Sequence, residues 1–353
     1  MPTAFIIGGG IAGFNAAIAA AKKNYQIVLL EQASFFEYAS SRNAAIARTY
    51  DPDPELVYPL QKSVLNMIHI PNLLNKQGLL LKPLERDYIS ESHPLHPDLK
   101  PTHQETKTSF GDFFSGLWIP ANGAVDLSLL HAHLKQEVVH YATKITFLEN
   151  AQVKEVCGSE WIHTIFYEDV NAQQSKLPLS KEDIVFLAAG SWSANPDQIG
   201  LQKSFPLNAY KRHLFFLKSE QASNQEPIYW SEQEDVYVKP ENGGYLVSLC
   251  EEWKTNGDDY HADEKIIQQL PESLKGSFQG LLHLGVQSYW ACLRTFSMDS
   301  RPILGWDPYH PNLFHVCGLG GKGVSLSLSL ANMILAEWDN KNAFSSFSPQ
   351  RFL

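Results

Sequence analysis

The chain has 353 residues, 44% of them hydrophobic, which is enough for two domains or one large α/β domain with a full core. Its 28 lysines and arginines against 38 aspartates and glutamates give a net charge of −10, which argues against nucleic acid as a partner. The four cysteines (Cys157, Cys250, Cys292 and Cys317) form no CxxC pair, so neither a disulfide framework nor a zinc site is predicted.

The N-terminus shows no targeting signal, because it enters an apolar stretch without a basic region or a cleavage site. No apolar run reaches the roughly 18 residues that a membrane span needs. We therefore expect a cytoplasmic protein without a membrane span.

The start of the chain has the pattern of a dinucleotide-binding βαβ unit. A strand is predicted over 4–7, a glycine-rich turn over 8–13, a helix over 14–21 and a second strand over 27–30, which ends at Glu31. The two strands, the glycine-rich turn, the helix and the acidic residue have the spacing of a dinucleotide-binding βαβ unit. We expect FAD or NAD to bind here, with Gly8, Gly10, Ile11, Ala12 and Gly13 at the pyrophosphate.

Each glycine of this turn has a predicted task. Gly8 permits the tight turn, Gly10 lets the backbone approach a pyrophosphate, and Gly13 lets the helix pack closely on the strand. Glu31, 18 residues after Gly13, is placed to accept hydrogen bonds from the ribose hydroxyls. A carboxylate there disfavours the 2′-phosphate of NADP.

The next part of the chain alternates between helices and strands. Ser40 or Ser41 is read as the cap of a helix, and a second helix is predicted over 56–73. Strands follow over 79–81 and 116–119. Asp126 is predicted to cap a helix over 127–139.

The following segments predict further strands. A hairpin is expected over 153–156 and 161–167, followed by a polar turn over 171–181. A buried strand over 184–190 ends in small residues, which leave room for a cofactor.

The segment from Pro206 to Arg294 alternates as antiparallel strands do, with strands expected over 213–217, 236–240 and 244–248. The chain then returns to a strand over 313–317, a glycine-rich loop over 318–323 and a helix over 324–338.

Four separated segments resemble the D-amino-acid oxidase superfamily of FAD-dependent enzymes. They are the N-terminal fingerprint, the Ser-Arg-Asn-Ala-Ala run at 41–45, the strand end at 187–193, and 293–305 leading into the Gly-Gly-Lys-Gly run at 320–323. Within this superfamily the chain is most similar to D-arginine dehydrogenase and related D-amino-acid dehydrogenases, through the segments 207–212, 236–240 and 290–294.

The resemblance implies an α/β, two-domain fold: a Rossmann-like FAD-binding domain with a parallel sheet, and a substrate domain with a mostly antiparallel sheet. We expect the FAD-binding domain to comprise residues 1–80, 121–200 and 295–353, and the substrate-binding domain to comprise 81–120 and 201–294. Beyond the fingerprint and Glu31, the residues implied to bind FAD are Ser41, Arg42, Asn43, Ala44, Ala189, Gly190, Trp192, Arg301, Gly318, Gly320, Gly321, Lys322 and Gly323.

The resemblance also implies oxidative deamination of a D-amino acid, with hydride transfer from Cα to flavin N5 and hydrolysis of the imino acid. Arg294 is the expected carboxylate clamp, because a guanidinium matches a carboxylate bidentately. Tyr237 is expected on the same carboxylate or on the amine, and Arg212 is a weaker candidate. Lys322 and the helix start after Gly318 are predicted to face the flavin where negative charge gathers on reduction.

Cys292 falls where sarcosine oxidases of this superfamily carry the cysteine that bonds the flavin; a small buried cysteine is the alternative reading. Glu85, Asp87 and Glu91 are acids in a segment where the family places lids, and none is assigned a role.

Other functions remain open from the sequence. They are oxidation of sarcosine, glycine or another N-substituted amino acid, modification of a wobble uridine in tRNA, and service as a non-catalytic flavoprotein subunit. The predicted partner is an amino acid or small amine, and the electron acceptor is oxygen or a quinone.

Overall fold

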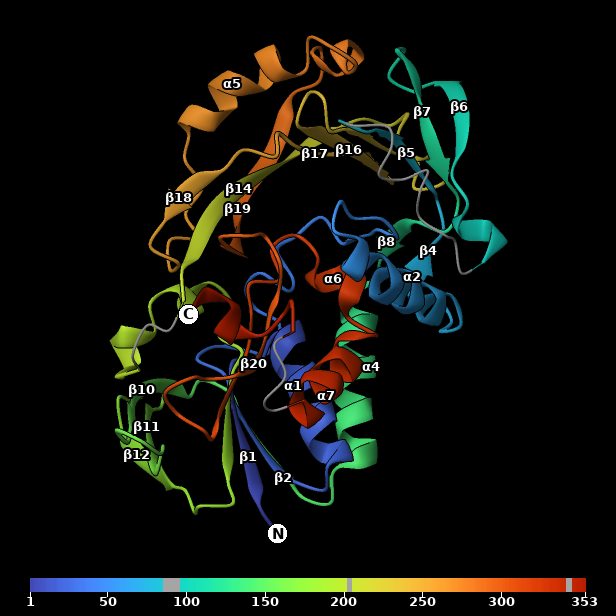
Figure 1. Ribbon diagram of the computed structural model, residues 1–353. Helices are drawn as coiled ribbons and strands as arrows, with labels where there is room; N and C mark the ends of the chain where they lie inside the picture. Colours follow the sequence, from blue (N-terminus) through green and yellow to red (C-terminus); the bar gives the residue numbers. More distant parts are fainter. Residues whose placement is uncertain (85–95, 202–204, 341–344) are drawn as a thin grey trace.

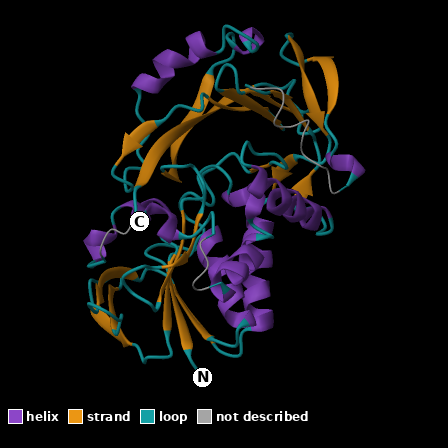
Figure 2. Ribbon diagram, viewed as in Figure 1, coloured by secondary structure: helices purple, strands orange, loops and turns teal. Residues whose placement is uncertain are grey.

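The computed structural model describes residues 1–84, 96–201, 205–340 and 345–353 (Figure 1). Glu85, Asp87 and Glu91 lie outside these residues. The chain forms two large sheets, one above the other in Figure 2. The predicted α/β fold with a parallel sheet and a mostly antiparallel sheet is confirmed.

The first sheet has the strand order β20-β21-β13-β1-β2-β9, and only β20 runs antiparallel to its neighbour. Because β1 lies between β2 and β13, the strand order reverses at β1, as in dinucleotide-binding folds. The strands are β1 (Thr3–Ile7), β2 (Gln26–Leu30), β9 (Ile145–Leu148), β13 (Ile184–Leu187), β20 (Ile303–Trp306) and β21 (Leu313–Cys317).

Helices cover one face of this sheet and a small sheet covers the other (Figure 1). The helices α1 (Ile11–Lys22), α4 (Leu127–Tyr141) and α7 (Leu330–Asp339) pack on the first face. Opposite them stand β10 (Gln152–Cys157), β11 (Thr164–Glu168) and β12 (Gln174–Pro178). The predicted N-cap Asp126 is confirmed, because its carboxylate accepts the N–H groups of Ser128 and Leu129, both at 2.9 Å.

The second sheet has nine strands in the order β18-β14-β17-β16-β15-β5-β7-β6, with β19 paired to β14. Only β5 and β15 pair in parallel. Its strands are β5 (Leu79–Lys82), β6 (Thr102–Lys107), β7 (Phe113–Ile119), β14 (Leu207–Lys218), β15 (Ile228–Ser231), β16 (Val236–Glu241), β17 (Gly244–Ser248), β18 (Trp253–Thr255) and β19 (Val286–Ser297). Helix α5 (Lys265–Ser273) covers its outer face (Figure 1).

Alternation along β16 directs its side chains to the two faces of this sheet. Val236 and Val238 join the cluster beneath α5, whereas Tyr237 joins the cluster on the inner face, toward the first sheet. The alternation in the sequence therefore directs the side chain of Tyr237 toward the first sheet.

The remaining elements are short or connect the two sheets. They are α2 (Pro54–Ile68), α6 (Gly323–Leu326), the small sheet of β3 (Ile46–Ala47), β4 (Leu74–Asn75) and β8 (Gly123–Val125), and the 3₁₀ turns η1 (Pro97–Leu99), η2 (Gly190–Ala194), η3 (Pro196–Ile199), η4 (Gln279–Leu281) and η5 (Pro349–Phe352). None of the helices in the described ranges has both the length and the apolar character needed to cross a membrane. The predicted domain boundaries stay a prediction.

Three local predictions are wrong. The helix predicted over 324–338 is divided into α6 and α7, because the backbone between them bonds to α2: the N–H of Leu328 donates to Ser63 Oγ at 3.0 Å. The polar turn predicted over 171–181 contains β12, which completes the small sheet. No helix begins at Ser40 or Ser41 in the described chain, where turns lead into β3.

The contact between α1 and β1 leads to a stability prediction. A Cβ at Gly13 would lie 1.8 Å from the Gly8 carbonyl oxygen, so Gly13→Ala must separate helix and strand. We expect a loss of about 1–3 kcal/mol in the free energy of unfolding, measured by urea denaturation of the apoprotein. Gly285→Ala is the matched control, since no atom lies within 4 Å of its added Cβ. Equal stability of the two variants would contradict the tight contact.

Candidate active site

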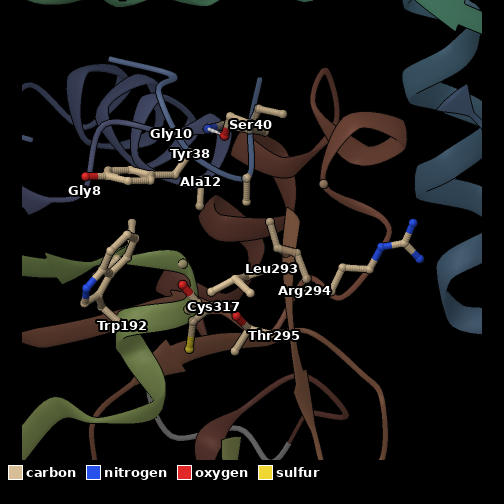
Figure 3. A pocket seen from close by; sticks show the side chains of 18 of the residues that line it. Gly8, Gly10, Ala12, Tyr38, Ser40, Trp192, Leu293, Arg294, Thr295 and Cys317 are labelled. Atoms are coloured by element: carbon tan, nitrogen blue, oxygen red, sulfur yellow. Dashed lines mark hydrogen bonds between the residues drawn. The ribbon is translucent and has the colours of Figure 1, made fainter. Parts of the chain in front are cut away.

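A cavity lies where the two sheets meet, and several separate parts of the chain contribute to its wall (Figure 3). The start of α1, the end of β2 and the η2 turn come from the first sheet, together with the loop after β21; β19 comes from the second. The predicted residues that line it are Gly8, Gly10, Ile11, Ala12, Glu31, Asn43, Ala44, Ala189, Gly190, Trp192, Tyr237, Cys292, Arg294, Gly318, Gly320, Gly321 and Gly323.

The start of α1 is shaped to receive an anionic group. Gly8 has φ of 110°, which favours glycine, and Gly10 precedes the helix without a side-chain cap. Ser40 Oγ instead accepts the N–H of Ile11 at 3.0 Å, from 29 residues away. The other N–H groups of the first turn have no acceptor within the helix, so this end of the cavity suits a pyrophosphate.

Glu31 is held rigidly at the end of β2. Its side chain is buried, and its two oxygens accept the N–H groups of Gly9 at 2.7 Å and Ala33 at 3.0 Å. Burial raises the pKa of the carboxyl above its ordinary value, and the backbone N–H groups oppose this shift. Each oxygen keeps acceptor capacity for a ribose hydroxyl.

Arg294 extends from β19 into the cavity wall, apart from the other labelled side chains in Figure 3. Its position depends on Gly321, because a Cβ there would lie 3.0 Å from Arg294 Nη1. Among the residues that the structure describes, no carboxylate lies within ion-pair distance of the Arg294 guanidinium. The guanidinium is therefore available for a carboxylate of a ligand.

Tyr237 lines the same cavity with a polar end that has no hydrogen-bond partner in the described chain. Burial raises its pKa to about 12, although the charge of Arg294 and the nearby Ser248 hydroxyl oppose the shift. At neutral pH the phenol is therefore protonated and can donate a hydrogen bond to a ligand.

Cys292 lies on β19 and its side chain is buried in the cavity wall. Burial raises the pKa of the thiol to about 11, although the nearby Arg294 and Arg42 lower it. Cys317 also lines the cavity, at the end of β21.

The other catalytic candidate, Arg212, does not line the cavity. Its guanidinium donates to the carbonyl of Cys250 and to Glu252 at 2.7 Å. Burial lowers its pKa, and so does the charge of Arg294. These contacts support a structural role, and we do not include Arg212 in the proposed site.

Five predicted cofactor residues also lie outside the cavity wall. Lys322 Nζ lies 3.5 Å from the Asp51 carboxylate, and burial lowers its pKa while Asp51 raises it. Arg301 lies 2.7 Å from Asp53, and the other three are Gly13, Ser41 and Arg42. The predicted charge of Lys322 toward the flavin has no support from this geometry, because Asp51 already faces its ammonium group.

The sequence did not point to several residues of the wall. Arg48 places its guanidinium 4.7 Å from the centre of the Trp230 ring, and both residues line the cavity. Tyr38 and Tyr260 flank Trp192. Tyr260 lies in a polar loop without periodicity, so no pattern in the sequence could have identified it.

The fold and the cavity have the features of a dinucleotide-binding protein. A family model described as FAD dependent oxidoreductase (DAO) matches residues 3–338, and the chain therefore belongs to this family. FAD is thus its cofactor, as predicted, and the protein is an FAD-dependent oxidoreductase.

Solved structures share this fold at low sequence identity. The L-proline dehydrogenase from P. horikoshii has a TM-score of 0.79 at 16% identity, with 99% of this chain and 97% of that chain covered. The L-amino acid deaminase from Proteus vulgaris has a TM-score of 0.74 at 14% identity, covering 100% and 97%. The glycine oxidase from Bacillus cereus has a TM-score of 0.71 at 16% identity, covering 97% and 96%.

The residues present fit FAD. The start of α1 offers N–H groups to the pyrophosphate, and Glu31 offers carboxylate oxygens to the ribose. The glycines at 318, 320 and 321 also line this cavity, beside β19.

Replacing Glu31 by Gln is predicted to weaken FAD binding about tenfold or more, because a charged acceptor is lost at the ribose. Wild-type affinity should also fall as the pH decreases, at a higher pH than for an ordinary glutamate of pKa 4.5, since burial favours the neutral acid. The dissociation constant is measured by quenching of FAD fluorescence. Glu182→Gln, an exposed acid, is the control. Unchanged FAD affinity of Glu31→Gln would remove Glu31 from the ribose site.

We predict that FAD is bound without a covalent link to Cys292. Burial raises the pKa of this thiol to about 11, so the thiol is protonated at neutral pH, whereas the thiolate is the nucleophile. Acid precipitation should therefore leave all flavin in the supernatant. A yellow pellet that turns colourless in Cys292→Ser would show the opposite.

Proposed function

We propose that the protein oxidises the Cα–N bond of a small amino acid, with a D-amino acid as the substrate class that the sequence resemblance favours. The observation that carries this proposal is the guanidinium of Arg294 in the cavity wall, which has no carboxylate partner among the described residues. The solved structures with the same fold include, by their names, a glycine oxidase and an L-amino acid deaminase. Their names support an amino acid as the substrate but leave its configuration open.

Arg294 binds the substrate carboxylate through two parallel N–H···O bonds, which fixes the orientation of Cα. Tyr237 donates a further hydrogen bond to the carboxylate, because its raised pKa keeps the phenol protonated. Apolar residues such as Ile46 and Leu293 also line the cavity, and in this proposal they limit the access of water to the reacting carbon.

Bound FAD supplies the acceptor for a hydride from Cα. The amine enters neutral, and its nitrogen lone pair forms the C=N bond as the hydride leaves. The proton released from nitrogen passes to solvent, so no side-chain base is required. Water then hydrolyses the imino acid to a keto acid and ammonia.

The second candidate is oxidation of an N-substituted glycine, such as sarcosine. The sequence resemblance favours it, because Cys292 stands where sarcosine oxidases carry a cysteine; in the structure Cys292 lines the cavity, and the candidate does not need a covalent link to FAD. An iminodiacetate oxidase with the same fold, at a TM-score of 0.72 and 19% identity, adds support by its name.

The test is an anaerobic stopped-flow screen of the FAD-loaded protein against D- and L-amino acids and sarcosine. We expect D-amino acids to bleach the flavin band. Bleaching by sarcosine alone would favour the second candidate. Absence of bleaching by every compound would contradict both, and would favour a tRNA-modifying or non-catalytic role.

Arg294→Ala is expected to weaken binding of the best substrate about 100-fold or more, because a desolvated charged pair is lost while FAD stays bound. Arg294→Lys should restore part of this loss, since it keeps the charge without the fork. Lys107→Ala removes an exposed positive charge on β6 and is the control. The substrate dependence of the flavin reduction rate provides the measurement. Unchanged kinetics in Arg294→Ala would exclude the clamp.

A further inference from the structure

A segment from the second sheet lies across the wall of the FAD cavity. Residues 256–263, here the 256–263 segment, connect β18 to α5. Tyr260 in its middle lines the cavity together with Tyr38 and Trp192, which belong to the other half of the molecule. Figure 3 shows Tyr38 and Trp192 together at one side of the cavity, with Arg294 at the other.

One end of the 256–263 segment is fixed to the η2 turn of the cofactor half. Ser191 Oγ donates to the carbonyl of Gly257, and it lies 3.2 Å from the Tyr260 hydroxyl. Asn195 donates to the carbonyl of Asn256. Gly257 has φ of 94°, and a Cβ there would lie 2.6 Å from the Ser191 carbonyl oxygen, so this close approach requires glycine.

The other end of the 256–263 segment is fixed to β14. Lys211, which is buried, forms an ion pair with Asp259 at 2.5 Å. The N–H of Asp263 donates to His213 Nε2 at 2.9 Å. Because Nε2 is the acceptor, the neutral ring carries its proton on Nδ1, where Glu251 accepts it. The segment is thus held by both halves of the molecule.

Tyr260 completes a cluster of three rings. Its ring centre lies 5.6 Å from that of Trp192 with an angle of 22° between the planes, and 5.1 Å from that of Tyr38. Arg42 stands over Tyr260 at 5.6 Å from the ring centre. All three rings are partly exposed and face the cavity, which makes them a surface on which a flat aromatic group can pack.

We propose that Tyr260 is a cofactor-positioning residue, and that the 256–263 segment closes over bound FAD and slows its release. FAD carries two flat aromatic ring systems, the chain belongs to a family of FAD-dependent enzymes, and the residues of this cavity fit FAD. In this proposal, FAD contacts the ring cluster when bound and displaces the segment as it leaves. This inference rests on FAD binding and is independent of which substrate is oxidised.

The experiment measures the release rate of FAD from the loaded full-length protein, by the rise in flavin fluorescence after dilution. Tyr260→Ala should release FAD about tenfold faster, since it loses the ring contacts and the bond to Ser191. Tyr260→Phe keeps the ring and should stay within about threefold of the wild type. Tyr309→Ala is the control, because Tyr309 is 42% exposed and does not line the cavity.

Two further measurements distinguish positioning from a merely structural role. The thermal midpoint of apo Tyr260→Ala should match that of the Tyr309→Ala apoprotein, and the fluorescence of its bound flavin should be higher, as quenching by the ring is lost. Asp259→Asn leaves the ring in place but removes the ion pair to Lys211, so it should also speed FAD release. FAD release at the wild-type rate in both Tyr260→Ala and Asp259→Asn would overturn the proposal. A thermal midpoint of apo Tyr260→Ala well below that of apo Tyr309→Ala would also overturn it, because a weakened fold would then explain faster release.

Discussion

One backbone hydrogen bond joins the two halves of the site: the N–H of Gly320 donates to the carbonyl of Thr295 at 2.8 Å. Thr295 belongs to β19, the strand that carries Arg294, and Gly320 belongs to the loop between β21 and α6. A Cβ at Gly320 would lie 2.6 Å from the Phe296 ring, so a larger residue would push the sheets apart. This bond holds β19, which carries Arg294, against the loop that follows β21.

The rest of the site follows from the direction of the parallel strands. β1, β2, β13 and β21 all end at the same edge of the sheet, and Gly8, Glu31, Ala189 and Gly318 follow them there. Open α/β sheets bind ligands outside this edge, where the strand order reverses. The second sheet covers the edge with its inner face, which brings Tyr237 and Arg294 toward the cofactor.

The sequence predicted those parts of the fold that are determined by a local pattern of residues. The spacing from β1 through Gly13 to Glu31 reflects one compact unit, so its strands, helix and glycines were predictable from that unit alone. The parts that failed depend on distant residues. Ser40 caps α1 rather than a helix of its own, and α2 divides the last predicted helix at Leu328. The ion pair of Lys322 with Asp51 likewise depends on the fold, which no spacing reveals, while the predicted role of Lys322 at the flavin stays a prediction.

The central claim is that Arg294 holds a carboxylate next to FAD in this cavity. A crystal structure of the FAD-loaded protein with a non-reacting carboxylate, such as acetate, tests it most directly. We predict that both carboxylate oxygens lie about 3 Å from the Arg294 guanidinium, on the flavin side of Tyr237. A carboxylate bound away from Arg294, with the guanidinium turned out of the cavity, would contradict the account.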